Sequence, residues 1–97
     1  MTDRTACRTP NPEKLGITNI PTWKFDACRT ALLVALEKGP LPAKTIAKAA
    51  GAYLSDTDRA ALGSLGWHMT TVRLELEMRG EIERMPGVKP LTLRSVG

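Results

Sequence analysis

Aromatic, hydroxyl and cationic side chains gather near the start of one predicted helix. They are Trp67, His68, Thr70, Thr71 and Arg73. Threonine hydroxyl groups can hydrogen-bond base edges or phosphates, and an arginine can bond the major-groove edge of guanine through two nitrogen atoms. A helix that carries such residues in its N-terminal half has the chemistry to read a major groove. These residues therefore suggest duplex DNA as a partner.

Five further basic residues are candidates for contacts with a phosphate backbone. Arg84, Lys89 and Arg94 fall on a predicted C-terminal hairpin, and Lys44 and Lys48 stand one turn apart on an earlier predicted helix. Basic side chains bind phosphate groups without reading base sequence. This set predicts a contribution to DNA affinity that is independent of sequence.

Several of these candidates also have a simpler interpretation. Trp67 suits a side chain that packs the helix against its neighbours, His68 suits a surface histidine, and Lys44 with Lys48 suits a solvated helix face. Arg79 and Arg84 suit exposed ion pairs with nearby glutamates.

Acidic residues on and after the same helix argue against strong DNA binding. Phosphate neutralisation by basic side chains supplies most of the affinity for DNA, and negative charge opposes it. The acidic residues are Glu75, Glu77, Glu81 and Glu83.

Catalysis and metal binding find little support in the sequence. There is one histidine, and the two cysteines, Cys7 and Cys28, have no partners at metal-ligand spacing. The segment 63–66 does not resemble a nucleophile elbow, because no strand leads into it and no second histidine exists to form a triad. No glycine-rich phosphate loop is present. We expect a protein that is not an enzyme and that needs no metal ion or cofactor.

Composition favours one small domain in the cytoplasm. The chain has 97 residues, of which 42% are hydrophobic, enough for one core. A net charge of +4 is compatible with nucleic acid without being diagnostic. The two cysteines suit a reducing compartment. The longest apolar run, residues 31–36, is too short to span a membrane, and the N-terminus lacks the apolar stretch of a secretory signal.

The segment 63–84 is expected to position the candidate residues. Leu65, Met69, Val72 and Leu76 have the spacing of one helix face. Gly80 suits the left-handed position after the helix end, and a short strand follows it. The helix would then run directly into a hairpin.

The rest of the chain is predicted to supply the frame. Residues 1–21 are predicted to form an extended N-terminal arm, and residues 22–97 are predicted to form one domain. Leu15, Ile17 and Ile20 could dock the arm onto that domain or onto a partner subunit. Helices are expected over 22–38, with Thr22 as the N-cap, and over 43–50, followed by a short helix that begins at Ser55. Leu41 suits a very short strand, and a strand over 90–96 would close the hairpin after the turn at 86–87.

This order of elements resembles a winged helix-turn-helix domain, a mainly α fold with a small β-hairpin (α+β). The ending is similar to one common in bacterial winged-helix regulators, and residues 25–96 resemble the N-terminal winged helix of Mrr-type restriction proteins. A family of small uncharacterised bacterial proteins is the nearest resemblance. The residues that carry it are Gly63, Ser64, Gly66, Trp67, Thr70, Thr71, Val72, Leu74, Leu76, Glu77, Arg79, Gly80, Ile82, Glu83, Arg84, Pro86 and Gly87. The resemblance implies a DNA-binding protein and suggests the role of a small transcriptional regulator.

A second interpretation is a protein-interaction or dimerisation module on the same fold, without nucleic-acid binding. Leu74 and Met78 lie away from the predicted core stripe, on the same side as Trp67. Apolar strips of this kind usually mark contact surfaces. The N-terminal arm or a second subunit could cover this strip. Leu33 and Val34 make residues 31–36 apolar nearly all round, so this helix is expected to be central to the fold or to contact the arm or the partner of a homodimer.

Overall fold

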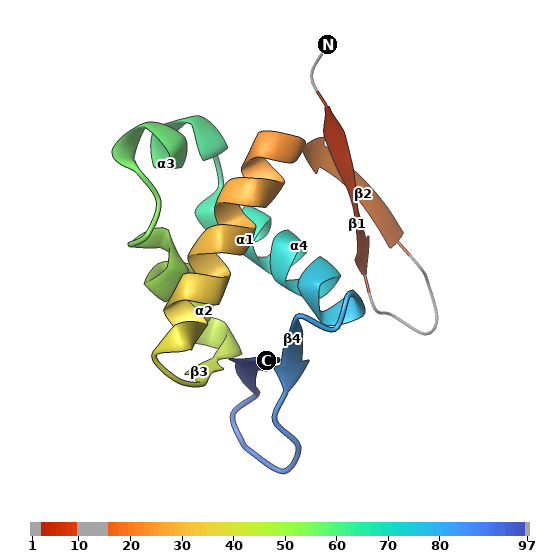
Figure 1. The fold of residues 1–97 in the computed structure, drawn as a ribbon, viewed down its shortest axis with the longest axis vertical. Helices are drawn as coiled ribbons and strands as arrows, with labels where there is room; N and C mark the ends of the chain where they lie inside the picture. The colour runs from red at the N-terminus through yellow and green to blue at the C-terminus, as the bar shows by residue number, and fades with distance from the viewer. Residues whose placement is uncertain (1–2, 10–15, 97) are drawn as a thin grey trace.

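The computed structural model describes residues 3–9 and 16–96, which form an α+β fold of helices and two small antiparallel sheets (Figure 1). The helices are α1 (Thr22–Glu37), α2 (Ala43–Gly51), α3 (Asp56–Leu62) and α4 (Leu65–Met78). The strands are β1 (Arg4–Thr9), β2 (Gly16–Pro21), β3 (Leu41–Pro42), β4 (Ile82–Arg84) and β5 (Thr92–Ser95). The α+β class expected from the sequence is thus confirmed. Within the described residues, no helix is both long and apolar enough to cross a bilayer.

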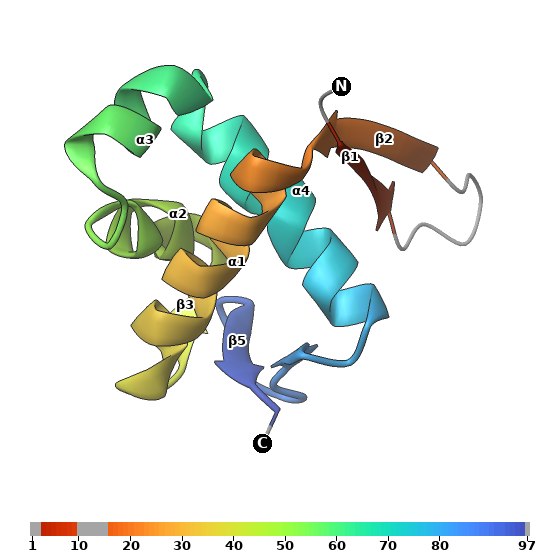
Figure 2. The ribbon, with the colours of Figure 1, turned by 45° about the horizontal axis from the view of Figure 1, so that its top comes forward.

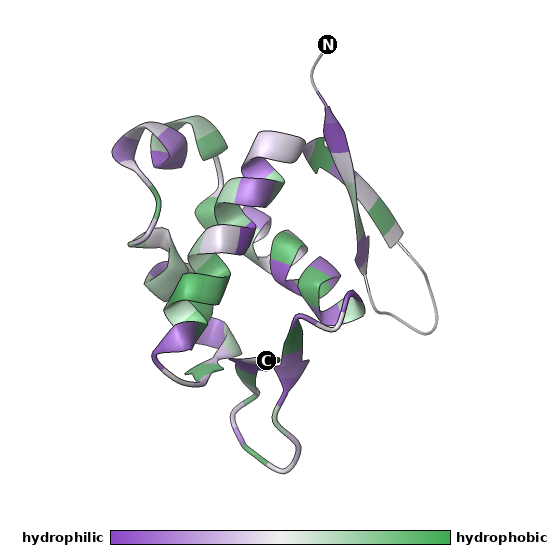
Figure 3. Ribbon diagram, viewed as in Figure 1, coloured by the Kyte–Doolittle hydropathy of each residue, from purple (hydrophilic) through white to green (hydrophobic). Residues whose placement is uncertain are grey.

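The core lies where α1 crosses α4, with α2 and α3 on one side (Figures 1 and 2). Figure 3 shows the hydrophobic residues of α1 concentrated in its C-terminal half. The predicted stripe of α4 is confirmed at Met69, Val72 and Leu76, which are fully buried, while Leu65 is half-buried against the core. One face of α1 is buried along the whole length of the helix. It includes Phe25, Cys28, Leu32, Ala35 and Leu36.

The C-terminal sheet has the order β3-β5-β4, with both neighbouring pairs antiparallel. Leu93 on the central strand is paired with Leu41 on one side and Arg84 on the other, and it is fully buried. The strand predicted over 90–96 is shorter in the structure, since β5 spans Thr92–Ser95. Leu91 and Val96, which flank this strand, are 37% and 49% exposed.

The described part of the N-terminal arm is a β-hairpin. Strands β1 and β2 pair antiparallel, with Cys7 opposite Thr18 and Thr5 opposite Ile20. Cys7 and Ile20 are buried in the main core, whereas Ile17 is 66% exposed. Of the three residues expected to dock the arm, Ile20 therefore does so, Ile17 does not, and Leu15 lies outside the described residues.

Two predicted helix starts have different outcomes. Ser55 caps α3 as expected, because its hydroxyl accepts a hydrogen bond from the Asp58 N–H at 3.0 Å. Thr22 was expected to cap α1, and this is wrong: Pro21 occupies the N-cap position. The Thr22 hydroxyl instead hydrogen-bonds the Thr5 hydroxyl at 2.9 Å and so ties the helix start to β1.

Candidate nucleic-acid interface

The start of α4 is fixed by a cap that the sequence reading missed. Ser64 is the N-cap, and its hydroxyl accepts from the Trp67 N–H at 3.3 Å. The His68 ring is bound through Nδ1 to the Ser64 carbonyl oxygen at 2.7 Å and meets the Trp67 ring edge to face, 4.8 Å between centroids. Gly63 makes the turn before the cap with φ of +90°. A serine followed by a periodic apolar stripe was the signal that could have revealed this cap.

The outer side of α4 presents a mixed surface of aromatic, hydroxyl and apolar groups. Trp67 is 48% exposed and Met78 is 37% exposed. Thr70 is exposed, and Thr71 and Leu74 are half-buried. These five side chains are available to a partner, and only the two threonines among them bring hydrogen-bonding hydroxyl groups.

Arg73 is less available than the sequence suggested. Its side chain is 11% exposed, and its Nη1 donates to Glu77 Oε2 at 2.8 Å. Burial lowers the pKa of Arg73 below its usual value, although the guanidinium keeps its carboxylate partner. A contact between Arg73 and a base would require this ion pair to open.

Glu77 links α4 to the C-terminal hairpin. While one of its oxygen atoms holds Arg73, the other accepts from Arg84 Nε at 2.6 Å. The Glu77 side chain is 9% exposed, whereas the Arg84 side chain is 51% exposed. The carboxylate therefore fixes one nitrogen of Arg84 and leaves much of that guanidinium at the surface.

Glu75 is the charged residue that the structure buries most completely, at 1% exposure. Its Oε1 accepts from the Arg8 backbone N–H and Nε, each at 2.9 Å, and its Oε2 accepts from Arg8 Nη2 and Arg79 Nε. These hydrogen bonds, chiefly those from the Arg8 side chain, lower the pKa of Glu75 to about 2 in spite of burial. Glu75 is thus an ionised anchor that attaches β1 to α4.

All four glutamates of α4 and the following segment have arginine partners. Arg79 pairs with Glu75 as the sequence suggested, and Arg84 pairs with Glu77. Further pairs join Arg29 to Glu81 and Arg94 to Glu83. The negative charge that opposed DNA binding in the sequence is therefore compensated locally.

Three lysines among the predicted phosphate contacts are exposed. Lys44 and Lys48 lie on α2, and Lys89 lies in the turn between β4 and β5. No salt bridge to them occurs within the described residues. The Ala43 N–H donates to the Leu91 carbonyl at 2.8 Å, which brings the start of α2 beside the end of that turn.

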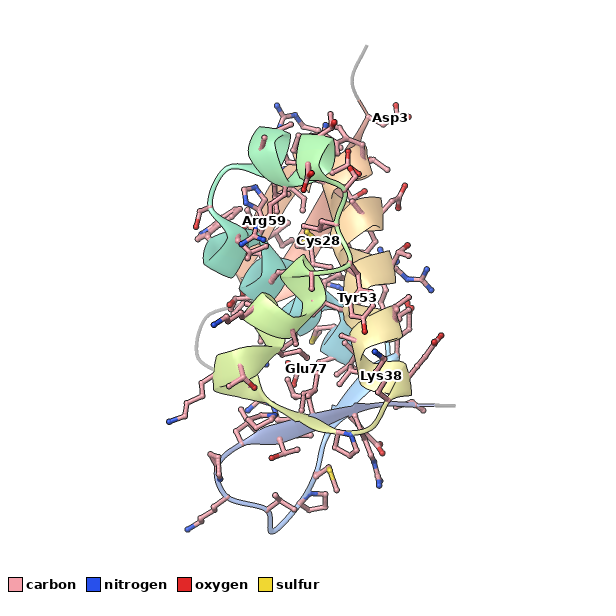
Figure 4. All side chains as sticks on the ribbon, turned by 90° about the vertical axis from the view of Figure 1, so that its left-hand side faces the viewer. Asp3, Cys28, Lys38, Tyr53, Arg59 and Glu77 are labelled. Carbon is pink, nitrogen blue, oxygen red and sulfur yellow. The ribbon has the colours of Figure 1, made fainter. Side chains whose placement is uncertain are left out.

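The residues expected at a dimer contact divide between core and surface. Leu33 is half-buried and packs against the core, and Val34 is half-buried. Figure 4 shows Tyr53 beside Lys38 next to α1, with the ammonium 5.5 Å from the ring centroid. The other four residues of the run 31–36 are buried in the core, so this run is covered in large part within the chain. Leu74 and Met78 form the more open pair.

Comparison with known proteins gives one match. Residues 4–93 match a protein family described as "Family of unknown function (DUF6958)". No curated protein and no solved structure matches the chain.

Proposed function

The chain belongs to this family of unknown function, DUF6958, and we propose that it is a winged helix-turn-helix protein that binds duplex DNA, in the role of a small transcriptional regulator. The observation that carries the proposal is the arrangement of α4 and the C-terminal sheet. The order α1, β3, α2, α3, α4, β4, β5 supports the proposal, because it is the order of elements whose likeness to a winged helix-turn-helix the sequence suggested, and β5 pairs with both β3 and β4. In this proposal α4 enters the major groove and the β4–β5 turn is the wing.

Electrostatics support the same proposal. The glutamates of α4 and β4 are paired with arginines, so they present less free negative charge to a phosphate backbone than the sequence implies. Lys44, Lys48 and Lys89 supply exposed positive charge from α2 and from the proposed wing. Their ammonium groups would neutralise phosphates and release counterions, which favours binding at low salt.

The side chains on α4 argue for modest base specificity. Thr70 and Thr71 offer hydroxyl groups, and Trp67 offers an apolar ring edge to a thymine methyl group. Arg73, the best candidate for guanine, is held by Glu77. Binding in this proposal therefore depends more on phosphate contacts than on direct reading of bases. The free buried thiols of Cys7 and Cys28 suit a reducing compartment, so the proposal includes a cytoplasmic location.

Fluorescence anisotropy of a labelled random duplex, measured over a salt series, tests the proposal. We expect the logarithm of the binding constant to fall linearly with the logarithm of salt concentration. Combining Lys44→Ala, Lys48→Ala and Lys89→Ala should reduce that slope by about 2 to 3. Arg4→Ala, which removes an exposed charge from the hairpin, is the control and should change the slope little. Absence of binding at low salt and micromolar protein would refute DNA binding.

A protein-interaction module is the second candidate, favoured by one specific surface. Trp67, Leu74 and Met78 occupy the same side of α4, and the described part of the N-terminal hairpin leaves Trp67 and Met78 exposed. Met78→Lys separates the two functions. It should strengthen DNA binding at low salt if α4 faces phosphates, whereas an interaction module would show no DNA binding with or without the substitution.

A further inference from the structure

The two edges of the N-terminal hairpin differ in their surroundings. Strand β1 packs against α4, with β2 on the far side of it (Figure 2). The Arg8 N–H on the edge of β1 donates to Glu75 Oε1 at 2.9 Å, so the carboxylate closes that edge. The outer edge of β2 has no strand beside it among the described residues.

Hydrogen-bond alternation shows which groups of β2 point outward. Because the Arg8 N–H points to Glu75, the opposite pair Arg8 and Ile17 cannot exchange hydrogen bonds across the hairpin. In an antiparallel ladder every second residue pair is a non-hydrogen-bonded pair, and the pair of Ala6 and Asn19 is therefore of the same kind. The N–H and C=O groups of Ile17 and Asn19 thus point away from β1. Pro21, which lacks an N–H, falls in the same set. The Thr22 N–H, one residue on, donates back to the Asp3 carbonyl at 2.9 Å, as the alternation requires.

Apart from Pro21 at its end, the described outer edge of β2 lacks the features that usually prevent strands from pairing. Strand β2 reads Gly-Ile-Thr-Asn-Ile-Pro and contains no charged residue. Natural edge strands commonly carry lysine, a bulge or a cover. Instead, Ile17 presents a side chain that is 66% exposed on the outer face of the hairpin.

We propose that two copies of this chain pair through the outer edges of their β2 strands, antiparallel about a two-fold axis at Thr18, to form one four-stranded sheet. In this register Ile17 lies opposite Asn19 of the second copy. By symmetry, Asn19 lies opposite Ile17 of the second copy. Each pair exchanges two N–H···O=C bonds, so the outward N–H groups of both residues are all satisfied. Pro21 ends the pairing at one side because it has no donor.

The positions of the charged residues are also compatible with a second copy at this edge. The strand order across the sheet would be β1-β2-β2-β1, so Arg4 and Arg8 of one copy lie three strand spacings from those of the other. At roughly 4.8 Å per strand this distance is about 14 Å, longer than the screening length of about 8 Å at physiological salt. The uncharged β2 strands meet at the centre, and repulsion between the two basic copies is weak there.

This surface differs from the side chains of α1 and α4 that the sequence suggested for a dimer. It uses backbone groups of the N-terminal hairpin and leaves the outer side of α4 free. The proposal therefore does not depend on the DNA-binding function.

Sedimentation equilibrium from micromolar to millimolar concentration is the primary test. The apparent mass should rise with concentration from 10.5 kDa toward twice that value. Ile17→Lys places a charge on the edge, and Asn19→Pro removes one outward donor without touching the hydrogen bonds of the hairpin. Each should weaken the dimer by about ten-fold or more.

Matched variants serve as controls. Asn19→Ala keeps the backbone N–H, and Val96→Lys adds the same charge at an aliphatic side chain that is 49% exposed. Val96 directly follows β5, which Figure 2 shows on the other side of the molecule from β1 and β2. Both should dimerise like the wild type. Circular dichroism should confirm that every variant is folded.

Amide hydrogen exchange provides an independent measurement. The amide protons of Ile17 and Asn19 should exchange more slowly as protein concentration rises. A wild-type protein that stays monomeric through the millimolar range would overturn the proposal. So would a dimer that Ile17→Lys and Asn19→Pro leave unchanged, since its interface would then lie elsewhere.

Discussion

The side chain of Glu75 holds an ionised carboxylate where almost no water reaches it. Removing such a group from water is costly, and the cost is offset only if its oxygen atoms are well paired. Arg8 in β1 and Arg79 at the end of α4 do this, and both arginine side chains remain over a third exposed. The arginines stay hydrated on one side while they neutralise Glu75 on the other.

Glu75→Gln should destabilise the protein at neutral pH. A carboxyl pKa that falls from 4.5 to about 2 on folding corresponds to roughly 3 kcal/mol. Because the pKa is lower in the folded state, this stability is present above pH 4.5 and is lost as pH falls toward 2. Urea unfolding at pH 7 should show a loss of about 2 to 3 kcal/mol in the variant.

Glu83→Gln is the matched control for this prediction. Glu83 and its partner Arg94 are 43% and 49% exposed, so the substitution should change stability by no more than about 0.5 kcal/mol. The difference between wild type and Glu75→Gln should shrink as the pH approaches 2. A difference that stays constant with pH would mean that the charge of Glu75 is not its cause.

The two thiols should be inert in the folded protein. Burial, followed by the neighbouring Cys7, raises the pKa of Cys28 to about 11, and burial with the Glu75 carboxylate raises the pKa of Cys7. Figure 4 shows Cys28 among the helices. A thiol-specific reagent at pH 8 should label neither residue in native protein and both in denaturant.

The raised pKa of Cys28 also predicts a loss of stability at alkaline pH. Since the folded protein holds the Cys28 proton more tightly, its stability is complete below pH 9 and falls as pH rises toward 11. Cys28→Ala should remove this part of the alkaline decline. Rapid labelling of native protein at pH 8 would contradict the burial of both thiols.

Among individual residues, the sequence predicted the apolar core better than the polar one. Met69, Val72 and Leu76 were identified by spacing, and all are fully buried. Glu75 was read as a solvent-facing charge, because its partner Arg8 lies on a strand 67 residues earlier. Local periodicity carries no information about a pairing of that kind.

The end of α4 is a Schellman motif that turns the chain into β4. The Glu81 N–H donates to the Leu76 carbonyl at 2.9 Å, and the Gly80 N–H donates to the Glu77 carbonyl at 3.2 Å. Gly80 has φ of +77°, which a residue with a side chain adopts only at a cost. This glycine was predicted from the sequence, and it sets where the helix ends.

The same substitution at two glycines should have opposite effects. Gly80→Ala should destabilise by about 1 kcal/mol through backbone strain alone, since a Cβ there would meet no atom within 4 Å. Gly66→Ala, inside α4 with equally open space, should stabilise by up to about 1 kcal/mol. Thermal unfolding of both variants checks the pair, and equal signs would contradict the explanation.

At the scale of elements, helices were predictable and the N-terminal hairpin was not. The helix predicted over 22–38 is found at Thr22–Glu37, and the one over 43–50 at Ala43–Gly51. Strand β1, Arg-Thr-Ala-Cys-Arg-Thr, has little hydrophobic alternation from which to recognise a strand. Its placement depends on Glu75 and on the buried Cys7, neither of which its local sequence reveals.

At the scale of the molecule, the hairpin and the helices share one core. Cys7 and Ile20 belong to the same buried cluster as Phe25 and Leu76. Arg79 adds a contact over the Phe25 ring, 4.6 Å from its centroid. A small protein with one core usually unfolds in a single cooperative step.

The fluorescence of the two tryptophans can test whether the protein unfolds in a single cooperative step. Trp23 lies in the first turn of α1, directly after β2, and Trp67 lies in the first turn of α4. Trp67→Phe and Trp23→Phe each leave one reporter, and the fluorescence midpoint of each variant should agree with its own circular dichroism midpoint. Earlier loss of the Trp23 signal would show that the hairpin detaches before the helices unfold.

The ion pair between Arg8 and Glu75 joins residues 67 positions apart, and this has a consequence for how the chain folds on the ribosome. Strand β1 is synthesised before the helix that it packs against. It must therefore wait, without its partner, until α4 has left the exit tunnel. Completion of the core should follow the synthesis of α4, however early α1 begins to form.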